Sequence, residues 1–389
     1  MGHLSRIGVL LLALWACAAE AKPYVPQDDA LVLERLPEKG DPALRELKRM
    51  RAALAGAPRN LDVAAAVARR AIEASRATGD PRFLGQAQAA LSPWWGVPEA
   101  PPVVVLLRAT IRQGQHDFDG ALSDLDRLLK ANPRAAQARL TRATVLTVVG
   151  RHTEAKADCI ELASVAAPLI VAGCLAVPTS LSGGAERAYA ELLRVLANPG
   201  TDTGTIQWAL TLAAEIAVRR GDAVAAEQHF RAALALDPHD AYLKGAYADF
   251  LLDAKRPLDV PPLLADDVKN DGLLLRLVLA EAQLPERRDA FVAHRAEMAA
   301  RFDAARQRGD SLHRREEARF RLAIEGDVPG ALRLARDNWN VQREPADLRI
   351  LIDAAKAAND AAALRIVIDW VAATRLEDRA ATAALAGSR

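Results

Sequence analysis

This 389-residue chain has few cysteines and few aromatic residues, and neither sign of charge is in excess. Cysteine occurs three times, aromatic residues make up 4% of the chain, and 51 basic against 50 acidic residues leave a net charge of +1. With no basic stripe and no polyacidic tail, nucleic acid is not expected as a partner. Beyond the N-terminal segment, no apolar stretch is long and charge-free enough to span a membrane.

Sequence motifs of catalysis are missing as well. The chain contains no GxxxxGK[ST] phosphate-binding loop, no HExxH motif and no CxxC motif. Ser182 lacks the preceding glycine that a nucleophile elbow requires. No two histidines stand three or four residues apart, the spacing of a helix-borne metal site. We therefore expect no enzymatic activity, no cofactor and no bound metal.

Four aspartates cluster just before and within a predicted helix, at a spacing that does not match a calcium-binding loop. They are Asp117, Asp119, Asp124 and Asp126. We expect Asp119 to cap the helix, and Asp124 and Asp126 to lie on its solvent-exposed side.

The N-terminus has the pattern of an export signal. Arg6 precedes a short apolar run over residues 7–19, and Ala19-Glu20-Ala21 fits the small-x-small cleavage rule. Cleavage there would leave Lys22 as the first residue of a periplasmic or secreted protein. The alternative is a lipid anchor, because Leu14-Trp15-Ala16-Cys17 is similar to a lipoprotein box with a bulky residue in the wrong place; Cys17 would then be lipidated.

A spacing of 34 residues runs through the rest of the chain. It separates Ala109 from Ala143, and also Ala214 from Ala248. A period of about 34 residues is typical of helix-turn-helix arrays. Alanine, leucine and arginine dominate the composition, and all three favour helices.

The best-registered stretch, residues 207–240, resembles a tetratricopeptide (TPR) repeat. Its small residues Ala214 and Ala226, its turn residue Gly221 and its terminal Pro238 match the pattern of that family. Small residues let paired helices touch, glycine makes the turn, and proline ends the second helix. The resemblance implies an all-α fold: a right-handed superhelical solenoid of TPR-like antiparallel helix pairs.

The expected organisation has four parts: a signal peptide over residues 1–21, an N-terminal lead segment over 22–60, a TPR-like helical repeat array over 61–375, and a C-terminal capping helix and tail over 376–389. Pro261-Pro262 is expected to shorten one second helix. In an array of this kind each repeat is expected to contact only its neighbours.

Two cysteines remain after cleavage, Cys159 and Cys174. The repeat register places Cys159 in the second helix of one repeat and Cys174 in the first helix of the next, and these helices pack antiparallel. In an oxidising compartment such a pair predicts a disulfide bond.

The TPR resemblance also implies that first helices line a concave, partner-binding surface. Carried onto two units, the family's ligand positions predict these contact residues: Trp208, Thr211, Glu215, Tyr242, Asp249 and Asp253. The three acids would present negative charge and favour a partner with a basic segment. Trp208 is expected to act as an aromatic anchor, so that Trp208→Ala would weaken binding with the helices intact.

Two further features are expected to be structural. Trp94-Trp95, between prolines, is predicted to pack between repeats. The polar stretch 337–344 and the charged helix 313–319 are predicted to form a salt-bridged network.

These features together predict an exported, non-catalytic protein–protein interaction scaffold or adaptor of the cell envelope. The alternative is a glycan-binding or envelope-polymer-binding subunit of an export or assembly system. A glycan surface would need several exposed aromatic rings in line, whereas a protein surface needs one or two anchors.

Overall fold

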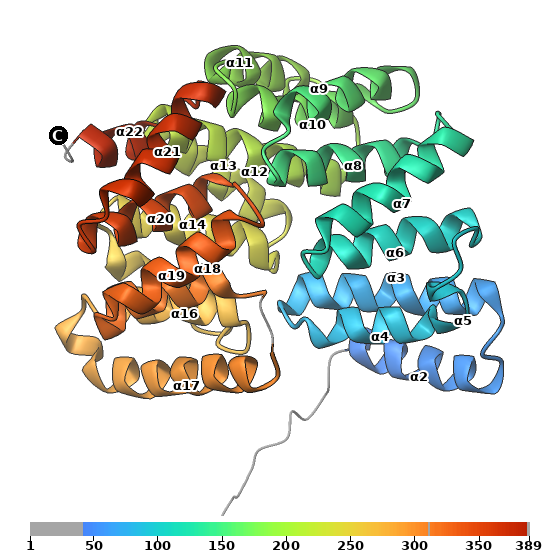
Figure 1. Cartoon of the computed structure of the whole chain (residues 1–389), viewed down its shortest axis with the longest axis horizontal. Helices are drawn as coiled ribbons and strands as arrows, with labels where there is room; N and C mark the ends of the chain where they lie inside the picture. The colour runs from blue at the N-terminus through green and yellow to red at the C-terminus, as the bar shows by residue number, and fades with distance from the viewer. Residues whose placement is uncertain (1–41, 310–311, 387–389) are drawn as a thin grey trace, which may run out of the picture. The chain divides into compact units, whose positions relative to one another are not determined.

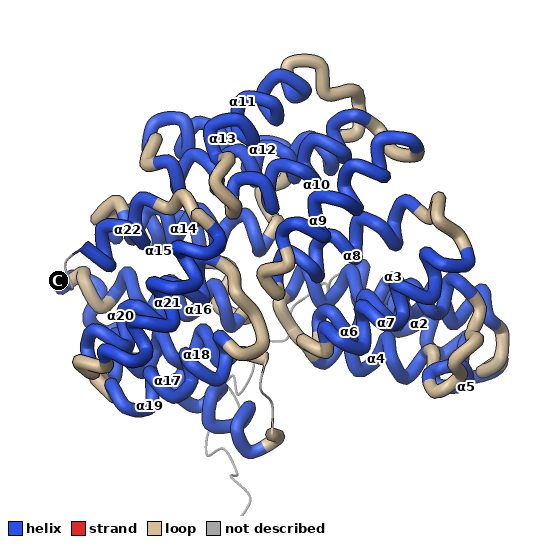
Figure 2. The backbone as a smooth tube through the Cα atoms, turned by 45° about the horizontal axis from the view of Figure 1, so that its top comes forward, coloured by secondary structure: helices blue, strands red, loops and turns tan. Residues whose placement is uncertain are grey.

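The computed structural model describes residues 42–309 and 312–386, and these residues form helices and no β-strand (Figures 1 and 2). The chain divides into two compact units, Met1–Pro42 and Ala43–Arg389, and the second contains almost all of the described residues. The predicted export signal, its cleavage site and Cys17 lie outside the described residues.

In the described part, nine helix pairs follow one another, and the two helices of each pair pack together. The pairs are α3 (Leu61–Thr78) with α4 (Arg82–Ala90), α6 (Pro102–Gly114) with α7 (Phe118–Ala131), α8 (Ala136–Val148) with α9 (His152–Glu161), α10 (Pro168–Ser180) with α11 (Ala185–Leu196), α12 (Thr203–Arg220) with α13 (Ala223–Leu236), α14 (Ala241–Asp253) with α15 (Val260–Leu264), α16 (Asp271–Glu281) with α17 (Arg288–Gln307), α18 (Arg314–Phe320) with α19 (Val328–Trp339), and α20 (Pro345–Ala357) with α21 (Ala361–Thr374).

Three helices stand outside these pairs: α2 (Pro42–Gly56) before them, α5 (Ser92–Trp95) in the connector after α4, and α22 (Arg379–Ala386) at the end. The all-α repeat solenoid predicted from the sequence is confirmed.

The periodic small residues lie where helices touch. Ala109, Ala143 and Ala214 are at most 2% exposed. Gly221 ends α12 in the left-handed conformation with φ of +78°, which glycine adopts without steric cost. The residues that repeat at the 34-residue spacing therefore lie at helix contacts and turns, as predicted.

Proline interrupts the pattern where expected. α15 has only five residues and contains Pro261 and Pro262, whose rings cannot continue a regular helix.

The prediction for the aspartate cluster was wrong for Asp119 and Asp124 and is confirmed for Asp126, which is exposed. Asp117, not Asp119, caps α7 by accepting the backbone N–H of Gly120 at 3.0 Å. Asp124 is fully buried and pairs with Arg108, whose own side chain is 2% exposed. Because Asp124 is a charged residue on a helix, it was expected to face solvent. Instead, Arg108 of α6 provides it with a charged partner inside the repeat.

The same arginine holds the tryptophan connector in place. One Nη of Arg108 donates to the carbonyl oxygens of Trp95 at 2.7 Å and Val97 at 3.0 Å. Trp94 and Trp95 are partly buried against the N-terminal core. The packing role predicted for this pair agrees with its position.

Cys159 of α9 and Cys174 of α10 form a disulfide bond, as the repeat register predicted. Their Cα atoms are 5.5 Å apart, and both residues are buried. The bond joins two consecutive repeats.

The expectation of neighbour-only contacts was wrong. The backbone N–H of Arg343, after α19, donates to the carbonyl oxygen of Val148 in α8 at 2.8 Å. Val341 packs on the apolar cluster between α7, α8 and α9. His152 of α9 meets Trp370 of α21 edge to face, with ring centroids 6.3 Å apart. The array curves enough for its last repeats to touch earlier ones.

Candidate partner-binding surface

The six predicted contact residues lie on two neighbouring first helices, α12 and α14. Each helix starts after an aspartate that accepts a backbone N–H of the first turn, Asp202 for α12 and Asp240 for α14. The side-chain amide of Gln207 also donates to Asp240 at 3.0 Å. These bonds fix the helix starts, and so they orient the side chains that follow.

Tyr242 is the aromatic side chain that this surface exposes, at 65% of its area. Its hydroxyl donates to the Glu215 carboxylate at 2.6 Å. The charge of Glu215 raises the pKa of Tyr242 well above its usual range, so the hydroxyl remains a donor. The charge of Glu344 adds to this rise, and that of Arg315 opposes it.

Glu215 itself is partly buried. Burial raises the pKa of its carboxyl, while the hydrogen bond from Tyr242 and the charge of Arg219 oppose that rise. Tyr242 and Glu215 therefore present an aromatic ring beside a carboxylate whose negative charge is only weakly balanced by a nearby cation.

The other two predicted acids are neutralised. Arg276 of α16 and Arg319 of α18 each donate to Asp249 at 2.6 Å. Burial opposes ionisation of Asp249, but the two guanidinium groups hold its pKa at about 2. Asp253 pairs with Arg349 of α20 at 3.0 Å. The expectation that these two acids present free negative charge was wrong, because arginines from later first helices compensate them.

The side chains of Trp208 and Thr211 pack inside the array and do not project from its surface. Thr211 is 3% exposed, and its hydroxyl donates to the carbonyl oxygen of Gln207. The half-buried ring of Trp208 lies so close to Gly173 of α10 that a Cβ atom there would be 2.4 Å from it. Replacing Trp208 would remove packing between helices, so the expectation that Trp208→Ala leaves the helices intact is corrected.

A polar cluster continues the surface at the start of α20. Asp347 is fully buried and accepts hydrogen bonds from the side-chain amides of Asn338 at 2.8 Å and Gln342 at 3.0 Å. Arg315 lies between Asp347 and Glu344, 3.3 Å and 3.2 Å from their oxygens. Burial raises the pKa of Glu344 to about 7, with Arg315 opposing the rise and Asp347 adding to it. This cluster joins the two segments that the sequence predicted to form a network.

We call these first-helix side chains together the first-helix face: Glu215, Tyr242, Asp249, Asp253, Arg276, Arg315, Arg319, Glu344 and Arg349.

The arginines of the first-helix face were not predicted from the sequence. Arg276 and Arg319 are the sixth residues of α16 and α18, and Arg349 is the fifth residue of α20. These helices lie outside the best-registered repeats, so no ligand position could be carried onto them. The recurrence of an arginine near the same place in three first helices was the available signal.

Neither a metal centre nor a membrane span is visible in the described ranges. Across residues 42–309 and 312–386, no group of three or more His, Cys, Asp or Glu side chains is placed to hold a metal ion. No helix in the same ranges combines the length and the apolar character that crossing a bilayer requires.

No protein-family model matches the chain, and no curated protein matches it in sequence. Three similar solved structures differ widely in biology. A tetratricopeptide repeat protein from Parabacteroides merdae has 14% identity over 74% of this chain and 98% of its own, with a TM-score of 0.35. Yeast Tom70 has 11% identity over 89% and 84%, with a TM-score of 0.39. Human IFIT1, as a dimer with m7Gppp-AAAA, has 12% identity over 89% and 84%, with a TM-score of 0.39.

At these identities and TM-scores the similarities carry nothing about ligands. The chain's own features are more informative: consecutive antiparallel helix pairs, buried alanines at the 34-residue spacing and glycine turns. On those features the described part of the chain is an all-α solenoid of helical repeats.

Proposed function

We propose that the protein is an exported, non-catalytic scaffold or adaptor of the cell envelope that holds a partner protein on its first-helix face. The observation that carries the proposal is the exposed ring of Tyr242 beside Glu215. An aromatic side chain with one polar tip is a common anchor in protein interfaces, because it buries a large area at little cost in conformational entropy.

The ion pairs around Tyr242 support this role. Arg276, Arg319 and Arg349 hold side chains from α14, α16, α18 and α20 in fixed positions. A partner would therefore meet a preorganised polar surface with one aromatic anchor, which reduces the ordering cost of binding.

The partner's contacting segment is proposed to be basic. Asp249 and Asp253 are already paired, and Glu344 pairs with Arg315, so Glu215 is the acid of this face without an ion-pair partner among the described residues. A lysine or arginine beside Tyr242 would meet the Glu215 carboxylate, and added salt would weaken the contact because exposed charges are screened.

The glycan-binding alternative is less well supported. In residues 42–309 and 312–386, Tyr242 is the aromatic residue among the exposed large apolar side chains. A glycan surface would need a row of such rings, whereas one ring suits a protein anchor.

Export is proposed from the N-terminal sequence, and the Cys159–Cys174 bond is compatible with it, because disulfides persist mainly in oxidising compartments. Sequencing the mature N-terminus tests this part. A start at Lys22 supports signal cleavage, a blocked and lipidated Cys17 supports the anchored alternative, and an intact Met1 on cytoplasmic protein contradicts both.

Partner capture from the envelope fraction tests the binding role. The protein is cross-linked in cells and purified, and co-purified proteins are identified for the unmodified chain and for Tyr242→Ala. The matched control is Val224→Ala, which removes another exposed apolar side chain, on α13. Loss of one partner from Tyr242→Ala alone supports the proposal; an unchanged set of partners in both variants contradicts it.

A further inference from the structure

Helices α2 and α3 differ from the rest of the array in how their basic residues are used. Elsewhere most arginines are paired with carboxylates, as on the first-helix face. In α2, α3 and the turn between them, five exposed cations have no ion-pair partner among the described residues: Lys48, Arg49, Arg59, Arg69 and Arg76. We call these five residues the basic end.

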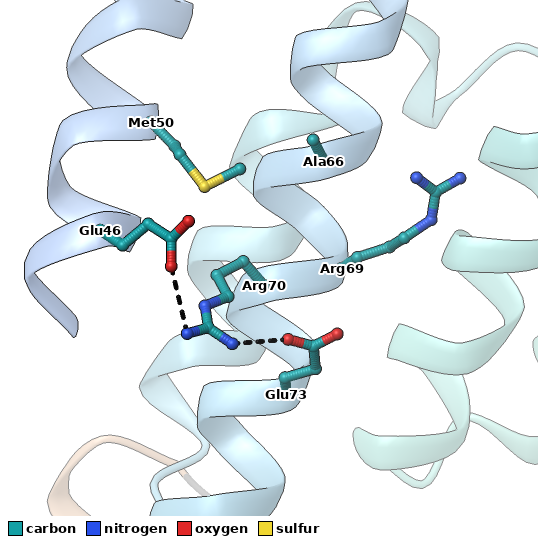
Figure 3. A pocket seen from close by; sticks show the side chains of 6 residues that line it. All are labelled: Glu46, Met50, Ala66, Arg69, Arg70 and Glu73. Atoms are coloured by element: carbon teal, nitrogen blue, oxygen red, sulfur yellow. Dashed lines mark hydrogen bonds and ion pairs between the residues drawn. The ribbon is translucent and has the colours of Figure 1, made fainter. Parts of the chain in front are cut away.

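The balanced charge of the whole chain hides this local excess. Residues 42–79 contain eight basic and three acidic residues, so this segment has a net charge of +5. The whole chain has a net charge of +1, and the remainder is therefore net negative. Two of the three acids, Glu46 and Glu73, are both engaged by Arg70 (Figure 3).

The helix geometry turns the basic end outward. Leu47 of α2 is buried, and Met50 and Leu54 pack with it on the N-terminal core. At 100° per residue, Lys48 and Arg49 lie away from that apolar side.

Two of the five cations lie on α3. Arg69 and Arg76 are seven residues apart and so share one side of that helix. Figure 3 shows that Arg69, which also lines the hollow in which Arg70 joins Glu46 and Glu73, points its guanidinium group away from these three side chains.

The composition of residues 42–79 distinguishes between kinds of anionic partner. Residues 42–79 contain no Phe, Trp or Tyr. Protein interfaces depend on aromatic anchors and apolar cores, whereas attraction to a lipid headgroup layer needs only a local excess of exposed cations. Unpaired arginine and lysine without an aromatic anchor therefore favour a membrane.

We propose that the basic end docks the protein onto an anionic lipid surface. The contact is peripheral and electrostatic, because no apolar side chain of the basic end is available to insert between lipids. It is separate from the first-helix face, and it does not depend on which partner that face holds.

Vesicle co-sedimentation tests the proposal with the processed protein. Vesicles of phosphatidylcholine alone are compared with vesicles containing three parts in ten phosphatidylglycerol, at low and at high salt. We expect binding to the anionic vesicles that high salt removes. Lys48→Glu/Arg49→Glu should lower that binding at least tenfold, since each cation near an anionic membrane contributes about fivefold.

The matched control is Lys130→Glu/Arg134→Glu, which makes the same charge change at two exposed positions at the end of α7. It should bind nearly as well as the unmodified chain, and circular dichroism should show equal helix content in all three proteins. Equal binding to neutral and anionic vesicles overturns the proposal, as does equal loss in both charge variants. Binding to soluble polyglutamate without binding to vesicles also overturns it, and would assign the basic end to an acidic protein.

Discussion

The backbone N–H of Arg343 donates to the carbonyl oxygen of Val148 at 2.8 Å, although 195 positions separate the two residues. Trp370 also takes part in this contact. Its ring meets that of His152, and its ring centroid lies 5.1 Å from that of Trp339. The contact closes the array onto itself, and its stability depends on His152 remaining neutral.

Acidification should weaken this contact. His152 is 5% exposed, and burial, with Lys156 adding to it, lowers its pKa to about 4 from 6.5. The stabilising contribution of the neutral ring is complete above pH 6.5 and is lost as pH falls toward 4, because the unfolded chain then takes up a proton that the folded chain does not. The effect should reach about 3 kcal/mol. Urea unfolding between pH 4.5 and 7.5 measures it.

The control for this titration is a second histidine. His152→Gln should flatten the pH dependence of unfolding in this range, whereas His239→Gln, at an exposed loop position, should leave it steep. Equal slopes in both variants would show that other groups dominate.

Removing the disulfide should destabilise the fold. The Cys159–Cys174 bond closes a loop of 15 residues, and its loss should lower the free energy of unfolding by about 3 kcal/mol. The variant Cys159→Ala/Cys174→Ala is compared with the unmodified chain, with and without reductant. Reductant should shift only the unmodified chain, and mass analysis of that chain should show two hydrogens fewer before reduction. Two free thiols in exported protein would contradict the bond.

The buried Arg108–Asp124 pair should be sensitive to the loss of one member. Arg108→Ala removes the most buried of three guanidinium groups that pair with Asp124, while Arg112 and Arg127 remain. We expect a cost of about 1.5–3 kcal/mol in chemical unfolding, the range for hydrogen bonds to a charged group. The connector should loosen as well, because Arg108 holds the carbonyl oxygen of Trp95. Protease cleavage near residue 97 would report that change.

Replacing both members should be far milder. Arg108→Met/Asp124→Leu removes two buried charges together. Arg112 and Arg127 also lose Asp124 as a partner, but both are partly exposed and can be hydrated instead, so most of the lost stability should return. The pair also predicts acid sensitivity. Burial raises the pKa of Asp124, but Arg108, Arg112 and Arg127 together outweigh burial, so that the pKa is lowered. Its stabilising effect is complete above the unfolded pKa of 3.8 and is lost as pH falls below the depressed value. A double variant as unstable as Arg108→Ala would contradict this account.

Gly173→Ala tests the packing of Trp208. The added Cβ would lie 2.4 Å from the indole ring, so the ring must move, and we expect a loss of about 1–3 kcal/mol in thermal or chemical unfolding. Gly85→Ala is the control, because nothing lies within 4 Å of its added Cβ. That change should stabilise α4 by roughly 0.5–1 kcal/mol. If both variants are stabilised, Trp208 points away from α10 and is free to bind.

Much of the fold follows from local patterns. Alanine at the 34-residue spacing, glycine at helix ends and proline after them specify where helices start, turn and stop, because these residues act within a few positions of themselves. The helix ending at Gly221, the shortened α15 and the Cys159–Cys174 bond were all predictable for that reason. The bond joins adjacent repeats, and the repeat register brings its two cysteines together.

The candidate site was only partly predictable. Tyr242 and Glu215 belong to neighbouring, well-registered repeats, and their pairing follows from that register. Asp249 and Asp253 looked alike in the sequence as free acids. Their arginines come from α16, α18 and α20, up to 96 positions away, and no local pattern specifies such a pairing.

The sequence by itself therefore determined the helices, their pairing and the disulfide, because each depends on short-range geometry. Only the tertiary structure decided which charges are compensated, which aromatic ring is exposed and that the array touches itself at Val148 and Arg343. These depend on the curvature that accumulates over many repeats, where a small rotation at each helix contact decides which distant side chains meet.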